Sequence, residues 1–467
     1  MSKNSRPNIL YLHCHDAGRF VQPYGYAIPA PNLQRLAEGG VLFHQAHCAA
    51  PTCSASRAGL LTGQVPHTCG MYGLASEYYG FTLDDYSKHL ANYLREHGYT
   101  TALAGVNHVA RGPWHDIRED YDTVLNLDDI GRPDNVSTVV RATEYLKEPH
   151  DKPFFLAVGI QEPHRNNPHP HVYTSQWEEE PEDIDPRYCQ PFPHLPNNDA
   201  TRRETANYKQ GVEIMDRKMG QVLDALDAAG LADDTLVICT TDHGPGMTEM
   251  KCTLTDRGTG VMLILRGPKG MPELRGGRVT DELVSQLDLY PTICELLDIP
   301  KPDWLQGVSL ASMLRGEASD VRDEIFTEQN WHANYRPLRA IRTRRYKYIR
   351  RFNPDEVRGV DEGPAEWMLG EYGYRERPHP TEELYDLIFD PNEADNLADS
   401  PEHRDVIQDL RERLATWMSE TDDALLQDGI PEPPSWFTEE FKHRRPEGWT
   451  PGQFKQAFAR EDVEKPG

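Results

Sequence analysis

The chain has 467 residues, of which 38% are hydrophobic, and a formal net charge of −26 at pH 7. A surface this acidic repels nucleic acid and anionic membranes, and no apolar run approaches the roughly 20 residues that a membrane-spanning helix needs. These properties exclude nucleic-acid-binding and membrane-spanning proteins, and the length favours one large domain plus a smaller one.

The N-terminus and the cysteines bear on the cellular compartment. Residues 1–7 are polar and lack the apolar stretch and cleavage site of a signal peptide. The eight cysteines are scattered without a CxxC pair, which is typical of reduced thiols. We therefore expect a cytoplasmic protein.

Short apolar runs alternate with helical patterns through the first two thirds of the chain. Strand-like runs lie at 8–13, 100–104, 153–160, 235–240 and 261–265. Residues 31–37 predict a helix that begins at a proline and ends at a glycine pair. Residues 205–230 predict a longer helix, because their apolar side chains recur at helical spacing.

This alternation predicts an α/β fold, with a large mixed, mostly parallel sheet and helices on both of its faces. Active sites on such sheets gather at the C-terminal ends of the strands. Asp16 and Asp242 each come just after an apolar strand. We therefore expect these two distant segments to meet at one edge of the sheet.

The pattern changes near residue 320. Residues 324–328 and 339–350 read as strands of a smaller antiparallel sheet. A helix at 402–418 follows, with Ser400 as its expected N-cap. Its expected buried stripe consists of Val406, Leu410, Leu414 and Trp417. We predict a main catalytic domain over 1–320, a C-terminal subdomain over 321–425 and an extended tail over 426–467.

One short segment suggests chemistry. Cys53-Ser-Ala-Ser-Arg57 is followed by a Leu-Thr-Gly turn that ends at Gly63. We expect Cys53 to begin a helix, where free backbone amides stabilise negative charge. Arg57 would then lie on the same helix face and hold the nucleophile. The competing interpretation is a buried structural cysteine beside a surface arginine, because a pattern this short also occurs by chance.

The segment resembles the signature of the formylglycine-dependent sulfatases, a family of the alkaline-phosphatase-like superfamily. The resemblance implies that Cys53 is oxidised to formylglycine, whose hydrate supplies one hydroxyl for attack on sulfur and a second to release the sulfated intermediate. It spans about residues 7–425 and is greatest for the heparan N-sulfatase (sulfamidase) branch. The resemblance to the sulfamidase branch rests on stretches such as Gly70-Met-Tyr-Gly73 and Glu162-Pro-His-Arg165.

Two strand-end segments resemble the metal motifs of the family. The resemblance implies a divalent metal held by Asp16, Asp242, His243 and modified residue 53. His15 stands where the family has an aspartate, and is either a further ligand or a group that supports the ligands. The family metal is usually calcium, whereas imidazole ligands favour manganese or zinc. Seen singly, Asp242-His243 is as readily a strand-end cap.

Two histidines match acid and base residues of the family. His108 corresponds to the histidine that removes a proton from the intermediate and so expels sulfate, and His164 to the general acid for the leaving group. Val106 stands where the family commonly has a lysine, so one sulfate contact is absent or supplied by another residue. A lone histidine at a strand end is more often structural.

Charged residues near these histidines are candidates for substrate contacts. Lys251 matches a family lysine that holds sulfate, and Arg257 follows it in the same stretch. Glu162 and Arg165 flank His164 and would face substrate or metal. Each of these charges alone is more often solvated or part of a loop ion pair.

The sequence therefore predicts hydrolysis of sulfate esters or sulfamates, with a sugar as the favoured carrier. The expected partners are a sulfated small molecule or oligosaccharide and a formylglycine-generating maturase, and a homodimer is left open. His15, Val106 and His243 differ from the sulfamidase branch, so its substrate does not carry over. Two alternatives remain: a phosphonate monoester or phosphodiester hydrolase on the same scaffold, and a non-catalytic binding module with unmodified Cys53.

Overall fold

The computed structural model describes eight stretches of the chain. They are residues 6–75, 80–110, 116–126, 137–165, 184–332, 335–353, 364–427 and 429–431. Nearly all of the predicted tail over 426–467 lies outside them.

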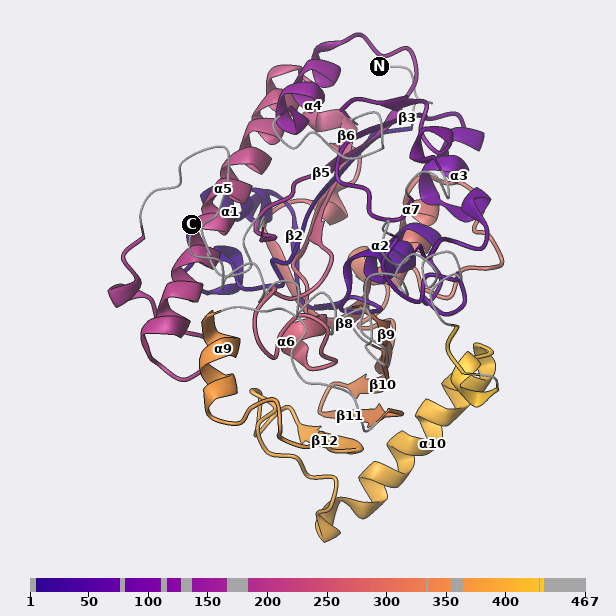
Figure 1. Cartoon of the computed structure of the whole chain (residues 1–467). Helices are drawn as coiled ribbons and strands as arrows, with labels where there is room; N and C mark the ends of the chain where they lie inside the picture. Colours follow the sequence, from indigo (N-terminus) through magenta and orange to yellow (C-terminus); the bar gives the residue numbers. More distant parts are fainter. Residues whose placement is uncertain are drawn as a thin grey trace, which may run out of the picture.

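A large mixed sheet forms the centre of the described structure (Figure 1). Its strands are β1 (Asn8–Cys14), β2 (Val41–His47), β3 (Thr100–Gly105), β4 (Thr123–Val124), β5 (Phe154–Gly159), β6 (Thr235–Thr241), β7 (Leu263–Arg266) and β8 (Arg278–Ser285). Their order is β4-β3-β5-β1-β6-β7-β2-β8, and only β7 runs antiparallel to its neighbours. Strands β5 and β6 are buried along their whole length, as expected for parallel strands covered on both faces.

Helices cover both faces of this sheet, as the sequence predicted (Figure 1). One face carries α1 (Pro31–Gly39), α4 (Thr138–Lys147) and α5 (Asp199–Ala228); the other carries α2 (Cys53–Thr62), α3 (Leu90–Glu96) and α7 (Leu289–Leu296). Two separate hydrophobic cores lie between these layers and the sheet. Two one-turn helices, α6 (Asp256–Thr259) and α8 (Ala311–Leu314), lie in the connections.

The long helix α5 begins earlier than the sequence pattern indicated. Asn198 and Thr201 form a reciprocal capping box, so the helix begins at Asp199 rather than near residue 205. The first turns carry several charged side chains and few apolar ones, and this explains why hydrophobic spacing alone placed the start too late.

A four-stranded antiparallel sheet follows, in the order β12-β11-β10-β9. Its strands are β9 (Glu324–Trp331), β10 (Tyr335–Thr343), β11 (Tyr346–Arg351) and β12 (Glu382–Asp386), and α9 (Pro364–Glu371) lies between the last two in sequence. Helix α10 (Arg404–Glu420) packs on one face of this sheet. This arrangement confirms the predicted smaller antiparallel sheet with a packed helix, while the division into domains at residue 320 stays a prediction.

Two details of α10 differ from the prediction. A 3₁₀ turn over Pro401–His403 precedes the helix, and the Ser400 hydroxyl lies 2.9 Å from Nδ1 of His403 instead of capping a backbone amide. The buried stripe is Ile407, Leu410, Leu414 and Met418, whereas Val406 and Trp417 are only partly buried. The stripe is thus displaced by one residue at each end.

A buried charge cluster joins the smaller sheet to the large one. Asp256 of α6 accepts hydrogen bonds from Arg19, Arg342 of β10 and Lys347 of β11. Lys347 also pairs with Glu393, 2.9 Å away. Burial alone would raise the pKa of Asp256, but the surrounding cations hold it well below its usual range. The two sheets are therefore connected through the ionised carboxylate of Asp256.

Other whole-chain features agree with the composition. All eight cysteines are buried, and none of them forms a disulfide in the structure. Within the described ranges, every helix is too short or too polar to cross a lipid bilayer.

Candidate active site

Two adjacent parallel strands bring the predicted metal motifs together. β1 pairs with β6 in a register that sets Cys14 beside Thr241, so both strands end at the same edge. The next residues then meet: the backbone N–H of Asp16 donates to Oδ1 of Asp242 over 2.9 Å. The predicted meeting of these distant segments is confirmed.

The turn after β1 is tight around Asp16. Asp16 has a left-handed backbone, with φ of 51°, and its carboxylate is buried. A Cβ at Gly246 would lie 2.7 Å from Oδ2 of Asp16, so the carboxylate fits only because position 246 is glycine. Oδ1 of Asp16 is buried without a hydrogen bond, and Nε2 of His243 lies 3.5 Å from it. A carboxylate oxygen that no hydrogen bond satisfies is suited to a cation.

Cys53 lies at the first position of α2, as predicted. Its sulfur is 3.3 Å from Nε2 of His243. Burial raises the pKa of the Cys53 thiol, an effect that exceeds the opposing influence of Lys251. An unmodified cysteine here would therefore be a neutral thiol and a weak nucleophile.

Arg57 is buried below Cys53 and connects α2 to both strand ends. Its guanidinium donates to Nδ1 of His13 (2.6 Å), to the Cys14 carbonyl (2.9 Å) and to Oδ2 of Asp242 (3.0 Å). Burial alone would raise the pKa of Asp242, but the charges of His243 and Arg57 hold it well below its usual range. The described contacts of Arg57 thus orient Asp242, while the predicted hold on the nucleophile stays a prediction.

Two residues that the sequence did not single out support this arrangement. The Ser56 hydroxyl donates to the Asp242 carbonyl, 2.5 Å away, and to Oε1 of Gln286. The Gln286 amide donates to Thr240 and Thr241 at the end of β6. Gln286 lies in a segment that the sequence analysis treated as a mark of the fold alone, and nothing in the linear pattern indicated its partners.

Three histidines lie together beside Asp16. The ring of His15 is 4.7 Å from that of His108 and 5.1 Å from that of His164, both edge to face. Nδ1 of His15 is 3.1 Å from Oδ2 of Asp242, although neither ring nitrogen of His15 forms an aligned hydrogen bond. Burial, and then the charge of Arg57, lowers the pKa of His108 to about 3, so this imidazole is neutral at pH 7.

Lys251 also reaches this cluster. Its ammonium is 3.1 Å from Oδ2 of Asp16, and both side chains are buried. The lysine therefore lies beside the predicted metal ligands. Its contact with substrate stays a prediction.

The other predicted substrate-binding residues have protein partners. Glu162 accepts from Lys218 of α5 over 2.7 Å, and its other oxygen is buried without a partner. Arg165 pairs with Glu204, also on α5. Arg257 donates to the backbone carbonyls of residues 249 and 392. A substrate role for these three side chains stays a prediction.

Potential ligand atoms form two overlapping groups, each within 4.8 Å. One group consists of Asp16, Cys53, Asp242 and His243, and the other of His15, Asp16, Cys53 and His164. Two carboxylates, an imidazole and residue 53 match the predicted metal site. The imidazoles are the part of this donor set that differs from an all-oxygen calcium site.

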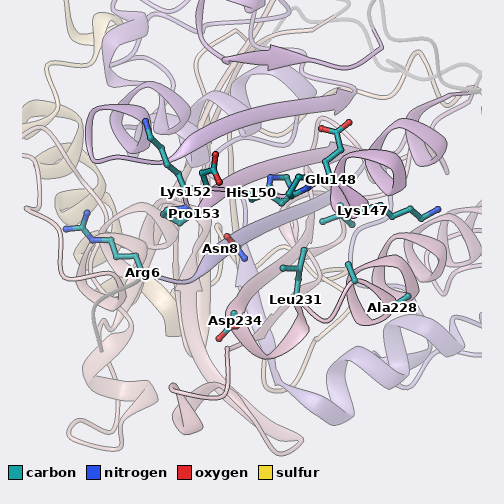
Figure 2. Close-up of a pocket in the computed structure, with 14 residues that line it drawn as sticks. Arg6, Asn8, Lys147, Glu148, His150, Lys152, Pro153, Ala228, Leu231 and Asp234 are labelled. Carbon is teal, nitrogen blue, oxygen red and sulfur yellow. The ribbon is translucent and has the colours of Figure 1, made fainter. Parts of the chain in front are cut away.

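A hollow of about 700 Å³ lies at the opposite edge of the sheet (Figure 2). Asn8 and Pro153, at the beginnings of β1 and β5, line it together with charged residues such as Arg6 and Lys147. Figure 2 shows Arg6 and Lys147 directed away from each other. Since β1 and β5 are parallel, this hollow lies at the end remote from His15 and Asp16.

Family models match most of the chain. Residues 7–299 match the family described as "Sulfatase", and residues 251–368 match "N-sulphoglucosamine sulphohydrolase, C-terminal". The first match covers well over half of the sequence.

Curated relatives agree with these matches. Human N-sulphoglucosamine sulphohydrolase is 31% identical over 90% of this chain and 91% of its own length. An ulvan-active sulfatase of Formosa agariphila is 29% identical over 92% of this chain and 83% of its own length.

Solved structures share the fold. A 2-O GAG sulfatase superposes with a TM-score of 0.69 at 22% identity, covering 93% of this chain and 96% of that one. A protein in complex with its substrate D-glucosamine-2-N,6-O-disulfate superposes with a TM-score of 0.68 at 19% identity, covering 90% and 99%. The chain is a sulfuric ester hydrolase that belongs to the sulfatase family.

Proposed function

We propose that this enzyme removes sulfate ester or sulfamate groups from a sugar, with residue 53 as a formylglycine hydrate beside one divalent metal. The observation that carries the proposal is the convergence of separate segments on Cys53. The thiol is 3.3 Å from His243 and shares ligand-sized spacing with Asp16 and Asp242. A chance match to the five-residue motif around Cys53 would give no reason for Asp16, Asp242 and His243 to lie beside it.

Asp16, Asp242, His243 and residue 53 would hold the metal, and His15 borders them. When bound, the ion neutralises charge on the sulfuryl oxygens and lowers the pKa of the attacking hydroxyl. Nitrogen donors make manganese or zinc a better fit than calcium. Oδ1 of Asp16, which is buried without a hydrogen bond, supports a ligand role for that carboxylate.

Charge balance makes the site attractive to an anion despite the acidic surface. The carboxylates of Asp16 and Asp242 offset the cations Arg57 and Lys251, which pair with them. A bound dication therefore leaves two excess positive charges, and a monoanionic sulfate ester lowers this excess to one. The net −26 of the whole chain is screened over about 8–10 Å.

The modified residue 53 accounts for both halves of the reaction. One hydroxyl of its hydrate, already ionised, attacks sulfur; the bond from sulfur to the organic group breaks, and His164 gives a proton to the leaving oxygen or nitrogen. His108 then takes a proton from the second hydroxyl, the bond to sulfate breaks, and the aldehyde re-forms and adds water. Burial keeps the His108 imidazole neutral, which is the form that a base requires.

A sugar is the favoured carrier because of the relatives' names. The human relative is named for N-sulphoglucosamine, and the matched C-terminal family carries the same name. Other relatives are named for ulvan and for a hexuronate 2-O-sulfate. These names support a carbohydrate and leave O-sulfate and N-sulfate as two candidates.

The test uses protein co-expressed with a formylglycine-generating maturase. Initial rates would be measured on N-sulfoglucosamine, a panel of O-sulfated sugars, an aryl sulfate and an aryl phosphonate. We expect sulfated compounds to be preferred. A phosphonate preference of about a hundredfold or more, roughly 2.7 kcal/mol in transition-state binding, would assign the site to phosphonate chemistry instead.

A further inference from the structure

Gln329 of β9 is a buried amide whose hydrogen-bonding groups are both unused. Its side chain is fully buried, and neither its nitrogen nor its oxygen has a partner. In the described part of the chain, His15 is the other side chain that buries two polar atoms in this way. An unsatisfied buried amide destabilises the free protein, and native folds rarely keep one without a reason.

β9 runs beside the segment that leads into the nucleophile. The backbone N–H of Glu328 donates to the Ala49 carbonyl over 3.0 Å. Further along, Nδ1 of His332 lies 2.7 Å from the hydroxyl of Thr52, the residue just before Cys53. Gln329 lies between these two contacts along the chain.

Strand alternation sets the face on which Gln329 lies. Its neighbour Glu328 contacts His67, so the amide belongs to the opposite face of β9. Its register partner on β10 is Leu338, which packs in one cluster with Leu254. Gln329 therefore lies on the face of the small sheet that packs against the 251–254 loop.

That loop also touches the segment before the nucleophile. The backbone N–H of Cys252 donates to the Pro51 carbonyl over 2.9 Å, and the preceding residue, Lys251, pairs with Asp16 in the active site. Gln329 therefore faces the loop that follows Lys251, and this loop contacts Pro51, two residues before Cys53.

We propose that Gln329 binds the organic part of the substrate, by hydrogen bonds to a hydroxyl or N–H group near the sulfuryl group; this rests on the proposed function. A carboxamide both donates and accepts, which matches a sugar hydroxyl. Because it is neutral, it does not compete with Arg57 and Lys251 for the anionic sulfuryl oxygens. The Gln329 amide would favour a sugar over a carrier without hydroxyls, because such a carrier would leave the amide without a hydrogen bond in the complex, as it is in the free protein.

The test compares two substrates and three proteins. Wild type, Gln329→Leu and Thr327→Val, all with converted residue 53, would be assayed on the best sulfated sugar of the panel and on 4-nitrophenyl sulfate, whose carrier has no hydroxyl. Thr327 is the matched control, since it lies two residues away on the same face and is also buried. We expect Gln329→Leu to lower kcat/KM for the sugar by about 10- to 100-fold and to leave the aryl sulfate within about twofold. Thr327→Val should leave the ratio of the two rates unchanged.

Thermal unfolding separates substrate binding from a structural role. Because the amide has no partner in the protein, Gln329→Leu should keep the Tm or raise it. A lower Tm of Gln329→Leu would overturn the inference, as would an unchanged ratio of kcat/KM for the sugar sulfate to kcat/KM for the aryl sulfate. The inference would also fail if converted wild type hydrolysed the aryl sulfate but none of the sulfated sugars. If converted wild type turned over neither class of sulfate, the proposed function itself would fail.

Discussion

Nδ1 of His15 lies 3.1 Å from Oδ2 of Asp242, and yet the ring makes no aligned hydrogen bond to that oxygen. His15 also lies within ligand spacing of Asp16 and Cys53. A metal held by Asp16, Asp242 and residue 53 would therefore have the His15 imidazole beside it as a candidate nitrogen donor.

Replacing the imidazoles with oxygen donors should change which metal binds. We expect His15→Asp with His243→Asn to bind calcium about tenfold or more tightly than wild type and to lose zinc and manganese affinity. Titration calorimetry and metal analysis of the dialysed proteins measure this without relying on turnover. His97→Asn, a partly buried histidine in another region that bonds to the Tyr93 carbonyl, is the control. Equal calcium affinity in wild type and the double variant would refute the nitrogen-ligand account.

His108 should matter for the second half of the reaction. Because it is expected to release sulfate from residue 53, His108→Ala should give one equivalent of alcohol or amine product and then stop. Rapid-quench assays would show the burst, and peptide mass spectrometry would show one sulfuryl group on residue 53. Loss of the burst itself would contradict this role and place His108 in the first step.

His164 should matter in proportion to the basicity of the leaving group. Its ring is 5.1 Å from that of His15, at the same strand edge as the metal ligands. His164→Asn should lower kcat/KM about 10²- to 10⁴-fold for a sugar sulfate, whose leaving group needs a proton. With 4-nitrophenyl sulfate the loss should be far smaller. Equal losses on both substrates would indicate that His164 positions other groups and is not the general acid.

The C-terminal unit should depend on a buried ion pair between Asp423 and Arg339. Nε of Arg339 is 2.5 Å from Oδ2 of Asp423. Burial alone would raise the pKa of Asp423, but the guanidinium holds it below its usual 3.8. A depressed carboxylate pKa stabilises the fold above the unfolded value, and this stability is lost as pH falls through the folded pKa. The pair should therefore contribute in full at neutral pH and fail below about pH 3.8.

Asp423→Asn tests this pair. It should cost about 3 kcal/mol at pH 7, since the buried Arg339 loses its nearer carboxylate and keeps Glu328, 3.7 Å away. The loss of stability between pH 7 and pH 3 should also be smaller in this variant than in wild type. Asp409→Asn is the control, because Asp409 pairs with Arg413 on the surface of α10, where about 0.5 kcal/mol is expected. Urea unfolding from pH 3 to 7 measures both variants, and similar curves for the two would contradict the prediction.

The sequence predicted those strands whose burial on both faces shows directly as a run of apolar residues. Strands β1, β5 and β6 read as apolar runs because both of their faces are covered. β8 was missed because its first half is largely exposed and charged, and β2 was missed because His44 and Gln45 interrupt it. Whether such segments form strands depends on their place in the sheet and on packing against residues that are distant in the chain, so a local sequence pattern does not indicate them.

The residues of the site were likewise found where a local pattern indicates them and missed where a distant partner defines their role. The metal motifs were found because each comes just after a recognisable strand. Gln286, His332 and Glu204 were not found, because each acts through a partner more than 35 residues away in the chain. A lone glutamine or glutamate has no local pattern that indicates a distant partner.

Mass spectrometry of the Cys53 peptide, combined with turnover of a sulfate ester, tests the central claim most directly. Protein made with a maturase should show conversion of the CH₂SH side chain to CHO. Sulfate release should rise in proportion to the converted fraction, and Cys53→Ala should be inactive. Equal turnover by protein whose Cys53 remains an unmodified thiol, or no turnover by fully converted and metal-loaded protein, would contradict the account.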